Sequence, residues 1–162
     1  MRLSRQARYA VIGLFDIAYN GHGHAVQVRV IGERQGIPTR FLEQIFQRLR
    51  KGGLVEGKRG PGGGYRLARD PAEVDLRAIV EAVEGPLAAG GDAVARPPRG
   101  RAAQAGLAAG GTRADRGPSF LWPELAEELA EVLAATTLED LCRRAARAGV
   151  PRELLPGYEY QI

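Results

Sequence analysis

A glycine-rich segment in the N-terminal half restricts the fold more than any other part of the sequence. Residues 59–65 read RGPGGGY, with four glycines and one proline among seven positions. The short runs on either side, 54–59 and 64–68, have the composition of β-strands. Because glycine adopts positive φ angles without strain and proline fixes φ, the segment predicts the tip of a tight β-hairpin. Lys58 and Arg59 make that hairpin basic.

Two helices and a short strand are predicted before residue 37. Residues 5–20 carry apolar side chains at helical spacing, with Ser4 placed to cap the start. Residues 26–30 alternate valine with polar residues, which predicts a short strand. Residues 31–36 then predict a short helix that Gly36 closes.

Residues 39–51 predict an amphipathic helix, with Thr39 as the candidate cap. The apolar residues fall on one stripe, formed by Phe41, Leu42, Ile45, Phe46 and Leu49. The opposite face is polar and carries Arg40, Glu43, Gln44, Gln47, Arg48 and Lys51. Such a face can simply be solvated, but next to a turn and a basic hairpin we favour contact with nucleic acid.

The order of these elements predicts the fold class. Two helices, a turn, an amphipathic helix and a basic hairpin make a winged helix-turn-helix, which is mainly α-helical with a small β-hairpin. The polar face of 39–51 would enter the major groove, where base edges can be distinguished. The cationic hairpin would lie across the adjacent backbone or enter the minor groove. A further helix at 75–83 completes a DNA-binding domain predicted to span residues 1–84.

Charge is distributed unevenly along the chain. Residues 1–70 contain 13 Lys and Arg against 5 Asp and Glu, a net charge of +8, whereas residues 71–162 carry a net charge of −4. A basic half indicates a polyanionic partner. Nearly all of its cations are arginine, which suits bidentate contacts to phosphate and guanine. GC-rich codon usage would also produce this preference for arginine.

The C-terminal half changes character twice. Residues 85–118 consist almost entirely of Ala, Gly, Arg and Pro, which predicts a flexible linker or effector loop because little apolar surface is available to offset the ordering entropy. A reading-frame error in GC-rich DNA would give the same composition. Residues 119–148 predict two dimerisation helices, since the first has a wide apolar stripe. Residues 149–162 are expected to form a C-terminal tail.

Several classes of protein are not expected. No apolar run approaches the roughly 20 residues needed to cross a bilayer, and no signal peptide follows the basic N-terminus, so we expect a cytoplasmic protein without a membrane partner. The single cysteine excludes an intrachain disulfide and a Cys-rich zinc site. His22 and His24 are expected in a solvated turn, although they could supply nitrogen ligands. No motif points to catalysis, and we do not expect an enzyme.

Five short motifs occur together at fixed spacing: MRL at 1–3, RYAV at 8–11, IGERQGI at 31–37, FLEQIF at 41–46 and RGPGGGY at 59–65. Together they resemble the Rrf2 family of transcription factors, and within it the IscR-like iron–sulfur cluster regulators. The resemblance covers residues 1–84 without a gap and residues 119–142 more loosely. It implies a homodimer that binds double-stranded DNA and regulates genes for iron–sulfur assembly, iron use or redox stress.

The resemblance also implies which residues contact DNA. Glu43 and Gln44 correspond to base-reading residues, and Arg59 to the arginine of the wing. Arg40 stands where a smaller polar residue is common, which implies either an added phosphate contact or a change in the preferred site. Together with the fold, this predicts a DNA-binding set of Arg2, Thr39, Arg40, Glu43, Gln44, Arg48, Lys58, Arg59, Gly60, Pro61 and Gly62. Two alternatives stay open. One is a regulator of the same fold controlled by a protein partner or by thiol oxidation, and the other is an adaptor that uses the winged helix to bind protein.

The region that would hold a cofactor departs from the family pattern. Cluster-binding relatives carry three closely spaced cysteines followed by a fourth ligand, and an ungapped register here places Asp92, Pro98, Gln104 and Leu107 at those positions. The usual cluster cannot form, because cysteine thiolates hold its iron. The cofactor is therefore unknown: either an iron–sulfur cluster with atypical ligation or, as we expect, none.

Cys142 is the remaining candidate ligand. It lies on a mostly apolar helical face, where we expect it to be a small buried hydrophobe. The alternatives are a lone thiolate ligand for iron, or a redox-sensing thiol with a pKa lowered by Arg143 or Arg144.

Overall fold

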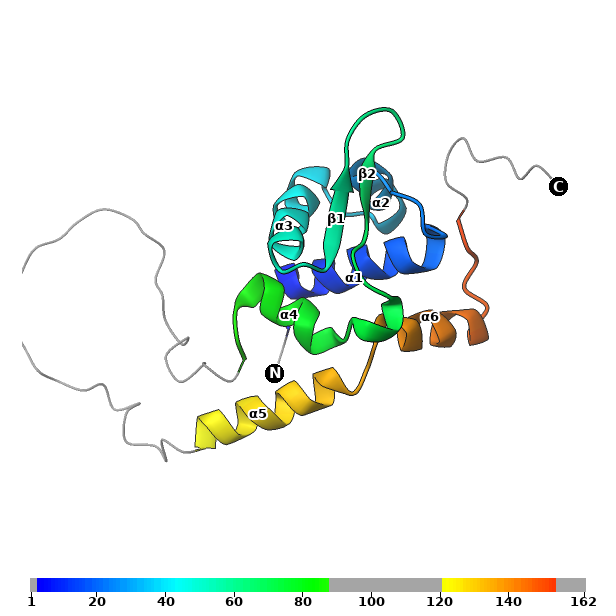
Figure 1. The fold of residues 1–162 in the computed structure, drawn as a ribbon. Coiled ribbons are helices and arrows are strands. Elements are labelled where there is room, and N and C mark those ends of the chain that lie inside the picture. The colour runs from blue at the N-terminus through cyan, green and yellow to red at the C-terminus, as the bar shows by residue number, and fades with distance from the viewer. Residues whose placement is uncertain (1–2, 88–120, 154–162) are drawn as a thin grey trace, which may run out of the picture.

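The computed structural model describes residues 3–87 and 121–153 of the 162-residue chain. In Figure 1, α1 crosses the middle of the molecule, with the hairpin and two helices on one side and the remaining helices on the other. The predicted class, mainly α-helical with one small β-hairpin, is confirmed. The elements are α1 (Arg5–Asn20), α2 (Val28–Gln35), α3 (Thr39–Lys51), β1 (Val55–Lys58), β2 (Gly64–Leu67), η1 (Pro71–Glu73), α4 (Leu76–Glu84), α5 (Leu121–Ala134) and α6 (Leu138–Arg147).

The first helix begins where the sequence predicts. The Oγ of Ser4 accepts a hydrogen bond from the backbone amide of Ala7 at 3.1 Å, which satisfies one of the amide groups that the first helical turn leaves unpaired. At the other end, the amide of Gly21 donates to the carbonyl of Ile17 at 2.9 Å. Both ends of α1 are therefore set by local side-chain and backbone signals.

The turn between α2 and α3 depends on glycine at two positions. Gly36 adopts a left-handed φ of 64°, which other residues reach only at a cost. A Cβ on Gly32 would lie 2.7 Å from the carbonyl oxygen of Ile37. These two glycines allow the short α2 to lead directly into α3.

The strand predicted at residues 26–30 is wrong. α2 begins at Val28, so Val28 and Val30 are helical, and only Val26 pairs in an extended conformation, through an antiparallel bridge to Tyr65. Alternation over five residues is too short to separate the period of a strand from one face of a helix.

The start of α3 differs from the prediction in two details. Pro38 precedes the helix and no side chain caps it, so Thr39 is its first residue and not its cap. Phe41 was expected on the apolar stripe but is 45% exposed. It lies at the edge of that stripe, whose buried members are Leu42, Ile45, Phe46 and Leu49.

One hydrophobic core joins the N-terminal helices to the C-terminal ones. Phe46 is fully buried, and a Cβ on Gly13 of α1 would come within 3.0 Å of its ring. The missing side chain at Gly13 therefore lets α1 and α3 approach closely. The same core contains Leu133 of α5 and Leu138 of α6.

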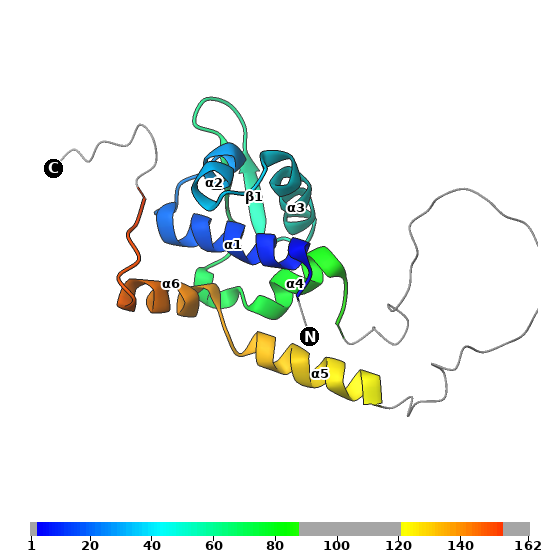
Figure 2. The same ribbon diagram turned by 180° about the vertical axis from the view of Figure 1, so that it is seen from behind.

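A short backbone bridge fixes the point where α6 begins. Thr137 pairs with Asp75 in an antiparallel bridge, and the amide of Leu138 donates to the carbonyl of Val74 at 2.8 Å. Thr137 and Asp140 also form a capping box. The hydrogen bond from the Thr137 amide holds the pKa of Asp140 below its ordinary value. Figure 2 shows that α6 lies against the body of the molecule, whereas the far end of α5 extends away from it.

Some of the predicted boundaries fall outside the described residues. This applies to most of the linker at 85–118 and to residues 154–162 of the tail. The division into a DNA-binding domain, a linker, dimerisation helices and a tail therefore stays a prediction. Within residues 3–87 and 121–153, no helix is long and apolar enough to span a membrane.

Candidate nucleic-acid interface

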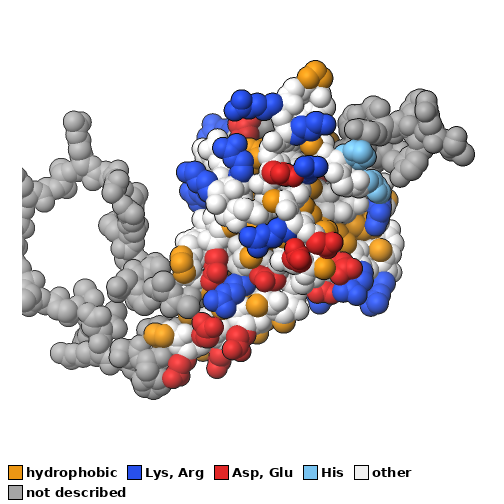
Figure 3. Space-filling view, viewed as in Figure 1, with side chains coloured by type: hydrophobic (Ala, Val, Ile, Leu, Met, Phe, Trp, Pro, Cys, Tyr) orange, Lys and Arg blue, Asp and Glu red, His pale blue; other side chains and the backbone are white. Residues whose placement is uncertain are grey.

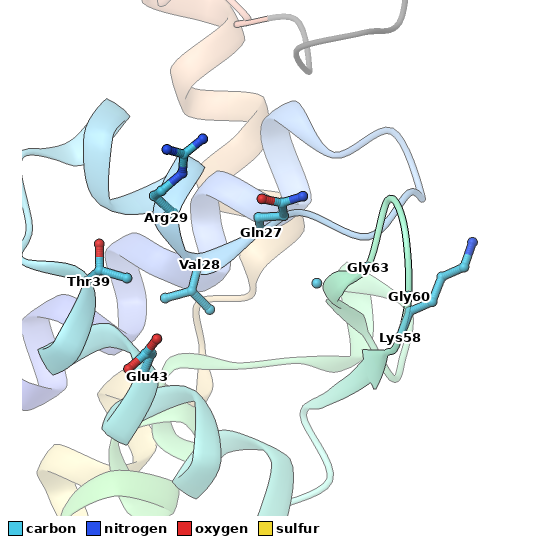
Figure 4. A pocket seen from close by; sticks show the side chains of 9 residues that line it. Gln27, Val28, Arg29, Thr39, Glu43, Lys58, Gly60 and Gly63 are labelled. Carbon is cyan, nitrogen blue, oxygen red and sulfur yellow. The ribbon is translucent and has the colours of Figure 1, made fainter.

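An open pocket of about 380 Å³ lies where the start of α2, the start of α3 and the hairpin meet (Figure 4). Thr39 and Glu43 line the α3 side of this pocket, and Lys58 extends away from the other labelled side chains. The surface thus combines two helix starts with a cationic loop. Its lining residues are Gln27, Val28, Arg29, Thr39, Glu43, Lys58, Gly60, Gly63 and Gly64.

The polar face of α3 is held outward by its buried stripe. Arg40, Glu43 and Gln44 are exposed, whereas the apolar residues on the other side of the helix are buried. The guanidinium carbon of Arg40 lies 5.2 Å from the ring centroid of Phe41, a cation–π contact that orients this arginine at the start of the helix. α3 therefore presents a cation, a carboxylate and an amide within two turns.

The hairpin forms the predicted wing. β1 and β2 pair antiparallel, with Lys58 opposite Gly64, and the amide of Gly63 closes the tip by donating to the carbonyl of Gly60 at 2.8 Å. In Figure 1 the tip projects beyond α2 and α3. Residues 58–62 are exposed, so the cations of the wing point into solvent beside the pocket.

The wing is docked onto the body by a third extended segment. Val26 and Tyr65 exchange two backbone hydrogen bonds, both 2.8 Å long, and the ring of Tyr65 lies 5.0 Å from that of Phe46. Gly64 has a φ of 146°, and a Cβ there would lie 2.3 Å from the carbonyl oxygen of Val26. The wing can approach the start of α2 this closely only with glycine at position 64.

Gly64→Ala is expected to destabilise the protein by about 2 kcal/mol or more, because the new methyl group must push Val26 and the wing apart. Urea unfolding followed by circular dichroism measures the loss. Gly62→Ala is the matched control: Gly62 has a φ of 71° with nothing within 4 Å of its Cβ position, so only backbone strain of about 1 kcal/mol is expected. Equal losses in the two variants would contradict the docking role of Gly64.

Charge separates between the two ends of the molecule. Figure 3 shows Lys and Arg side chains gathered over the part that carries α3 and the wing, and Asp and Glu side chains gathered toward α5, with a further group of Lys and Arg side chains near α6. The last turn of α3 adds Arg48, Arg50 and Lys51. A polyanion would therefore be attracted to the end of the molecule that carries the pocket.

The structure brings most of the predicted DNA-binding residues together. Thr39, Glu43, Lys58 and Gly60 line the pocket itself. The other residues on α3 and the wing are exposed beside it, namely Arg40, Gln44, Arg59, Pro61 and Gly62. Arg2 lies outside the described residues.

Arg48 is exposed, and its guanidinium also forms hydrogen bonds within the protein. Its Nη1 donates to the Oε1 of Gln6 at 2.6 Å and to the carbonyl oxygen of Val83 at 2.9 Å. These bonds tie α3 to the start of α1 and the end of α4. Contact of Arg48 with DNA therefore stays a prediction.

Five residues of the pocket were not in the predicted DNA-binding set, namely Gln27, Val28, Arg29, Gly63 and Gly64. Gln27 and Arg29 enter it from the start of α2. A strand at residues 26–30 would have put Gln27 and Arg29 on the face opposite the valines, with no indication that this face adjoins α3. A helix start at residue 28 would have placed Arg29 in the first turn, next to the start of α3.

Cys142 does not have the environment of a reactive thiol. It is half-buried in α6, and burial raises the pKa of its thiol, with Arg152 acting in the opposite direction. The hypothesis of a pKa lowered by Arg143 or Arg144 is therefore wrong. Cys142 is only partly buried, whereas the sequence led us to expect a small buried hydrophobe.

The residues present do not fit an iron–sulfur cluster of the usual kind. Such clusters are held mainly by cysteine thiolates, and the chain has one cysteine. Within the two described ranges, no group of three or more His, Cys, Asp and Glu side chains is arranged to hold a metal ion. Asp92, Pro98, Gln104 and Leu107 lie outside those ranges.

Cys142 is expected to react slowly with iodoacetamide at pH 7, because burial keeps the thiol protonated and the thiolate is the reactive form. In the unfolded protein in urea, the alkylation rate should stop rising with pH once the thiol is fully ionised. In the folded protein, the rate should still be rising at that pH. Mass spectrometry of quenched samples gives both rates. Faster alkylation in the folded protein at pH 7 would contradict this prediction.

Comparison with known proteins identifies the family. Residues 3–144 match the Rrf2 family model, described as an iron-dependent transcriptional regulator. The chain is 48% identical over 84 residues to the HTH-type transcriptional regulator IscR of Serratia proteamaculans (strain 568), covering 52% of this chain and 51% of that protein. It is 46% identical to the IscR of Escherichia coli O1:K1 / APEC over 84 residues, 52% of each chain. The chain thus spans about half the length of the curated relatives it matches.

Solved structures resemble most of the chain. An IscR from T. potens superposes with a TM-score of 0.66 at 28% identity and covers 94% of both chains. CymR, the global cysteine regulator of B. subtilis, superposes with a TM-score of 0.64 at 26% identity, covering 89% of this chain and 98% of CymR. The chain therefore belongs to the Rrf2 family of transcriptional regulators.

Proposed function

We propose that this protein is a sequence-specific regulator of transcription that binds duplex DNA with α3 and the wing. The observation that carries the proposal is the pocket where the polar side of α3 and the cationic wing lie next to each other. A major groove is wide enough to admit a helix, and a wing beside it can follow the phosphate backbone or enter the minor groove. Such a regulator acts in the cytoplasm, on the chromosome.

Each side chain of the interface has a chemical role in this proposal. The carboxylate of Glu43 can accept a hydrogen bond from the N4 amino group of cytosine. The side-chain amide of Gln44 can accept a hydrogen bond from N6 of adenine and donate one to its N7. Arg40 and Lys58 supply charge for phosphates. Arg59 extends the wing into the minor groove, where the negative potential attracts arginine.

In vitro selection tests the proposal directly. The full chain is incubated with a library of random duplexes, and bound duplexes are amplified over several rounds. We expect enrichment of a two-fold symmetric motif whose affinity falls as salt rises, because phosphate contacts release counterions. A pool that stays random, at low salt as well as at physiological salt, would refute sequence-specific binding.

The regulated genes are proposed from the relatives. Their names refer to iron dependence for the family and to cysteine regulation for CymR, and the sequence resembles IscR-like regulators. We therefore propose targets in iron–sulfur assembly, iron use or redox stress. Mapping the selected motif onto promoters of the source genome tests this, and a motif absent from promoters of such genes would refute it.

We further propose that the protein acts as a homodimer through α5. Val132 is 68% exposed and Leu125 is 45% exposed, and their spacing of seven residues places both on one face of the helix. Two-fold DNA sites pair with two-fold proteins. A second copy packed along this face would cover both side chains.

Val132→Asp is expected to shift the protein from dimer to monomer at micromolar concentration, because it puts a charge into the apolar contact. Light scattering coupled to size-exclusion chromatography measures the mass. Val132→Thr keeps the shape of the side chain without a charge and should remain dimeric. A wild-type protein that is monomeric, or a Val132→Asp variant that stays dimeric, would contradict the assignment.

A further inference from the structure

The segment that follows α6 returns along the C-terminal end of α1. We name residues 150–153 the C-terminal strap; Figures 1 and 2 both show it running from α6 past that end of the helix. The hydroxyl of Tyr19 donates to the carbonyl oxygen of Val150 at 2.7 Å. The amide of Glu153 donates to the Oδ1 of Asn20 at 3.0 Å, and the guanidinium carbon of Arg152 lies 4.8 Å from the ring centroid of Tyr19.

The strap also contacts α2, through one arginine. The Nε of Arg34 lies 3.2 Å from the Oε2 of Glu153, and its Nη2 donates to the carbonyl oxygen of Glu153 at 3.4 Å. The side chain of Arg34 is only 6% exposed. The side chain of Glu153 is 58% exposed. The pair thus differs from an ordinary surface salt bridge, in which both groups are solvated and contribute little, only on its arginine side.

The same arginine is anchored on α1 from its other side. Its Nη1 lies 3.1 Å from the Oδ1 of Asp16, whose side chain is completely buried. Gln35, the last residue of α2, donates to the Oδ2 of Asp16 at 2.8 Å. Because a buried carboxylate is stable only with such partners, the C-terminal end of α2 is fixed between Asp16 and Glu153.

The opposite end of α2 lies at the candidate interface. Val28 and Arg29, in its first turn, line the pocket together with α3 and the wing. A helix of eight residues is only about 12 Å long. A displacement of its Arg34 end as part of the whole helix would also move Arg29 relative to Thr39 and Glu43.

We propose that Glu153 is a positioning residue for DNA binding, which acts through Arg34 to hold α2 in the orientation that completes the interface. This rests on the proposed function. It links the segment after α6, in the predicted C-terminal tail, to the first helix of the helix-turn-helix. The link runs through the guanidinium of Arg34, which contacts both the carboxylate and the backbone carbonyl of Glu153.

Glu153→Ala separates positioning from electrostatics, because the two predict opposite signs. Removing a carboxylate from a DNA-binding protein strengthens binding if charge alone matters. Positioning predicts weaker binding, by about threefold to tenfold, which is typical of coupling through packed contacts. Glu73→Ala removes an exposed carboxylate on η1 and is the matched control; its affinity should be unchanged or slightly higher.

The readout is fluorescence anisotropy with the selected duplex, over a range of salt concentrations and well below the unfolding temperature. The slope of log affinity against log salt should be the same in wild type and Glu153→Ala, since no phosphate contact is lost. Glu153→Gln keeps a hydrogen-bond acceptor for Arg34, so its affinity for the duplex should lie between those of the wild type and Glu153→Ala. Unchanged or stronger binding by Glu153→Ala would overturn the proposal.

Hydrogen exchange gives a second readout that needs no DNA. Amides of α2 should exchange about threefold or more faster in Glu153→Ala, whereas amides of α4 should not change. If the wild type selects no duplex but the amides of α2 still exchange faster in Glu153→Ala than in the wild type, the proposed function fails. The structural link between Glu153 and α2 then still stands. If α2 exchange is unchanged, the link itself fails.

Discussion

Arg59→Ala is expected to lower the affinity for the selected duplex by about 10-fold to 100-fold and to reduce the salt slope by about one. Arg59 follows the last paired residue of β1 and is exposed at the projecting tip of the wing. Alanine leaves the hairpin intact because the docking contacts are made by Gly64 and Tyr65 on the other strand. Anisotropy titrations at several salt concentrations measure both quantities.

Arg59→Lys is the matched control for this prediction. It keeps the positive charge, so the dependence of affinity on salt should be retained. It loses the planar guanidinium group, whose shape suits a narrow groove. The affinity of Arg59→Lys is therefore expected between those of the wild type and the alanine variant. Equal binding by wild type and Arg59→Ala at every salt concentration would show that the wing does not contact DNA.

Phe46→Ala is expected to reduce the free energy of unfolding by about 3–5 kcal/mol, the usual cost of emptying a fully buried phenylalanine site. Phe46 has no exposed surface. Its ring fills the space left by Gly13 on α1 and lies beside Tyr65 of the wing. The variant therefore loosens the contacts of α3 with both α1 and the wing.

A second phenylalanine on the same helix provides the control. Phe41 is 45% exposed, so Phe41→Ala removes less buried surface and should cost about 1 kcal/mol or less. Urea unfolding followed by circular dichroism compares the two variants directly. Similar losses in both would mean that Phe46 is not the residue on which α1, α3 and the wing pack.

Local signals explain which parts of the fold were predictable. Ser4, Gly36 and the glycines of the wing each act within a few residues of where they stand, so α1, the turn before α3 and the hairpin could be predicted. The start of α2 could not be predicted, because the alternating valines around residue 28 are compatible both with a strand and with one face of a helix. The exposure of Phe41 depends on which edge of α3 faces its neighbours, and the apolar stripe alone does not determine that edge.

The same distinction applies to the candidate interface. Glu43 and Lys58 were predicted because a polar helix face and a basic hairpin are visible in short windows. Arg48 was assigned to that face, yet it hydrogen-bonds a carbonyl 35 residues away. The ties between Arg34 and Glu153 span 119 residues. No local pattern encodes such contacts, so neither could be found before the structure.

The position of α6 has a consequence for how the molecule is made. Leu138 belongs to the same core as α1, and Tyr19 bonds a carbonyl 131 residues later in the chain. Domains usually fold as units from the N-terminus during synthesis, but here the first helix packs against residues that are synthesised more than 100 positions later. Contacts of such long sequence separation slow folding. We expect the half that carries the wing to leave the ribosome first and to reach its final packing last.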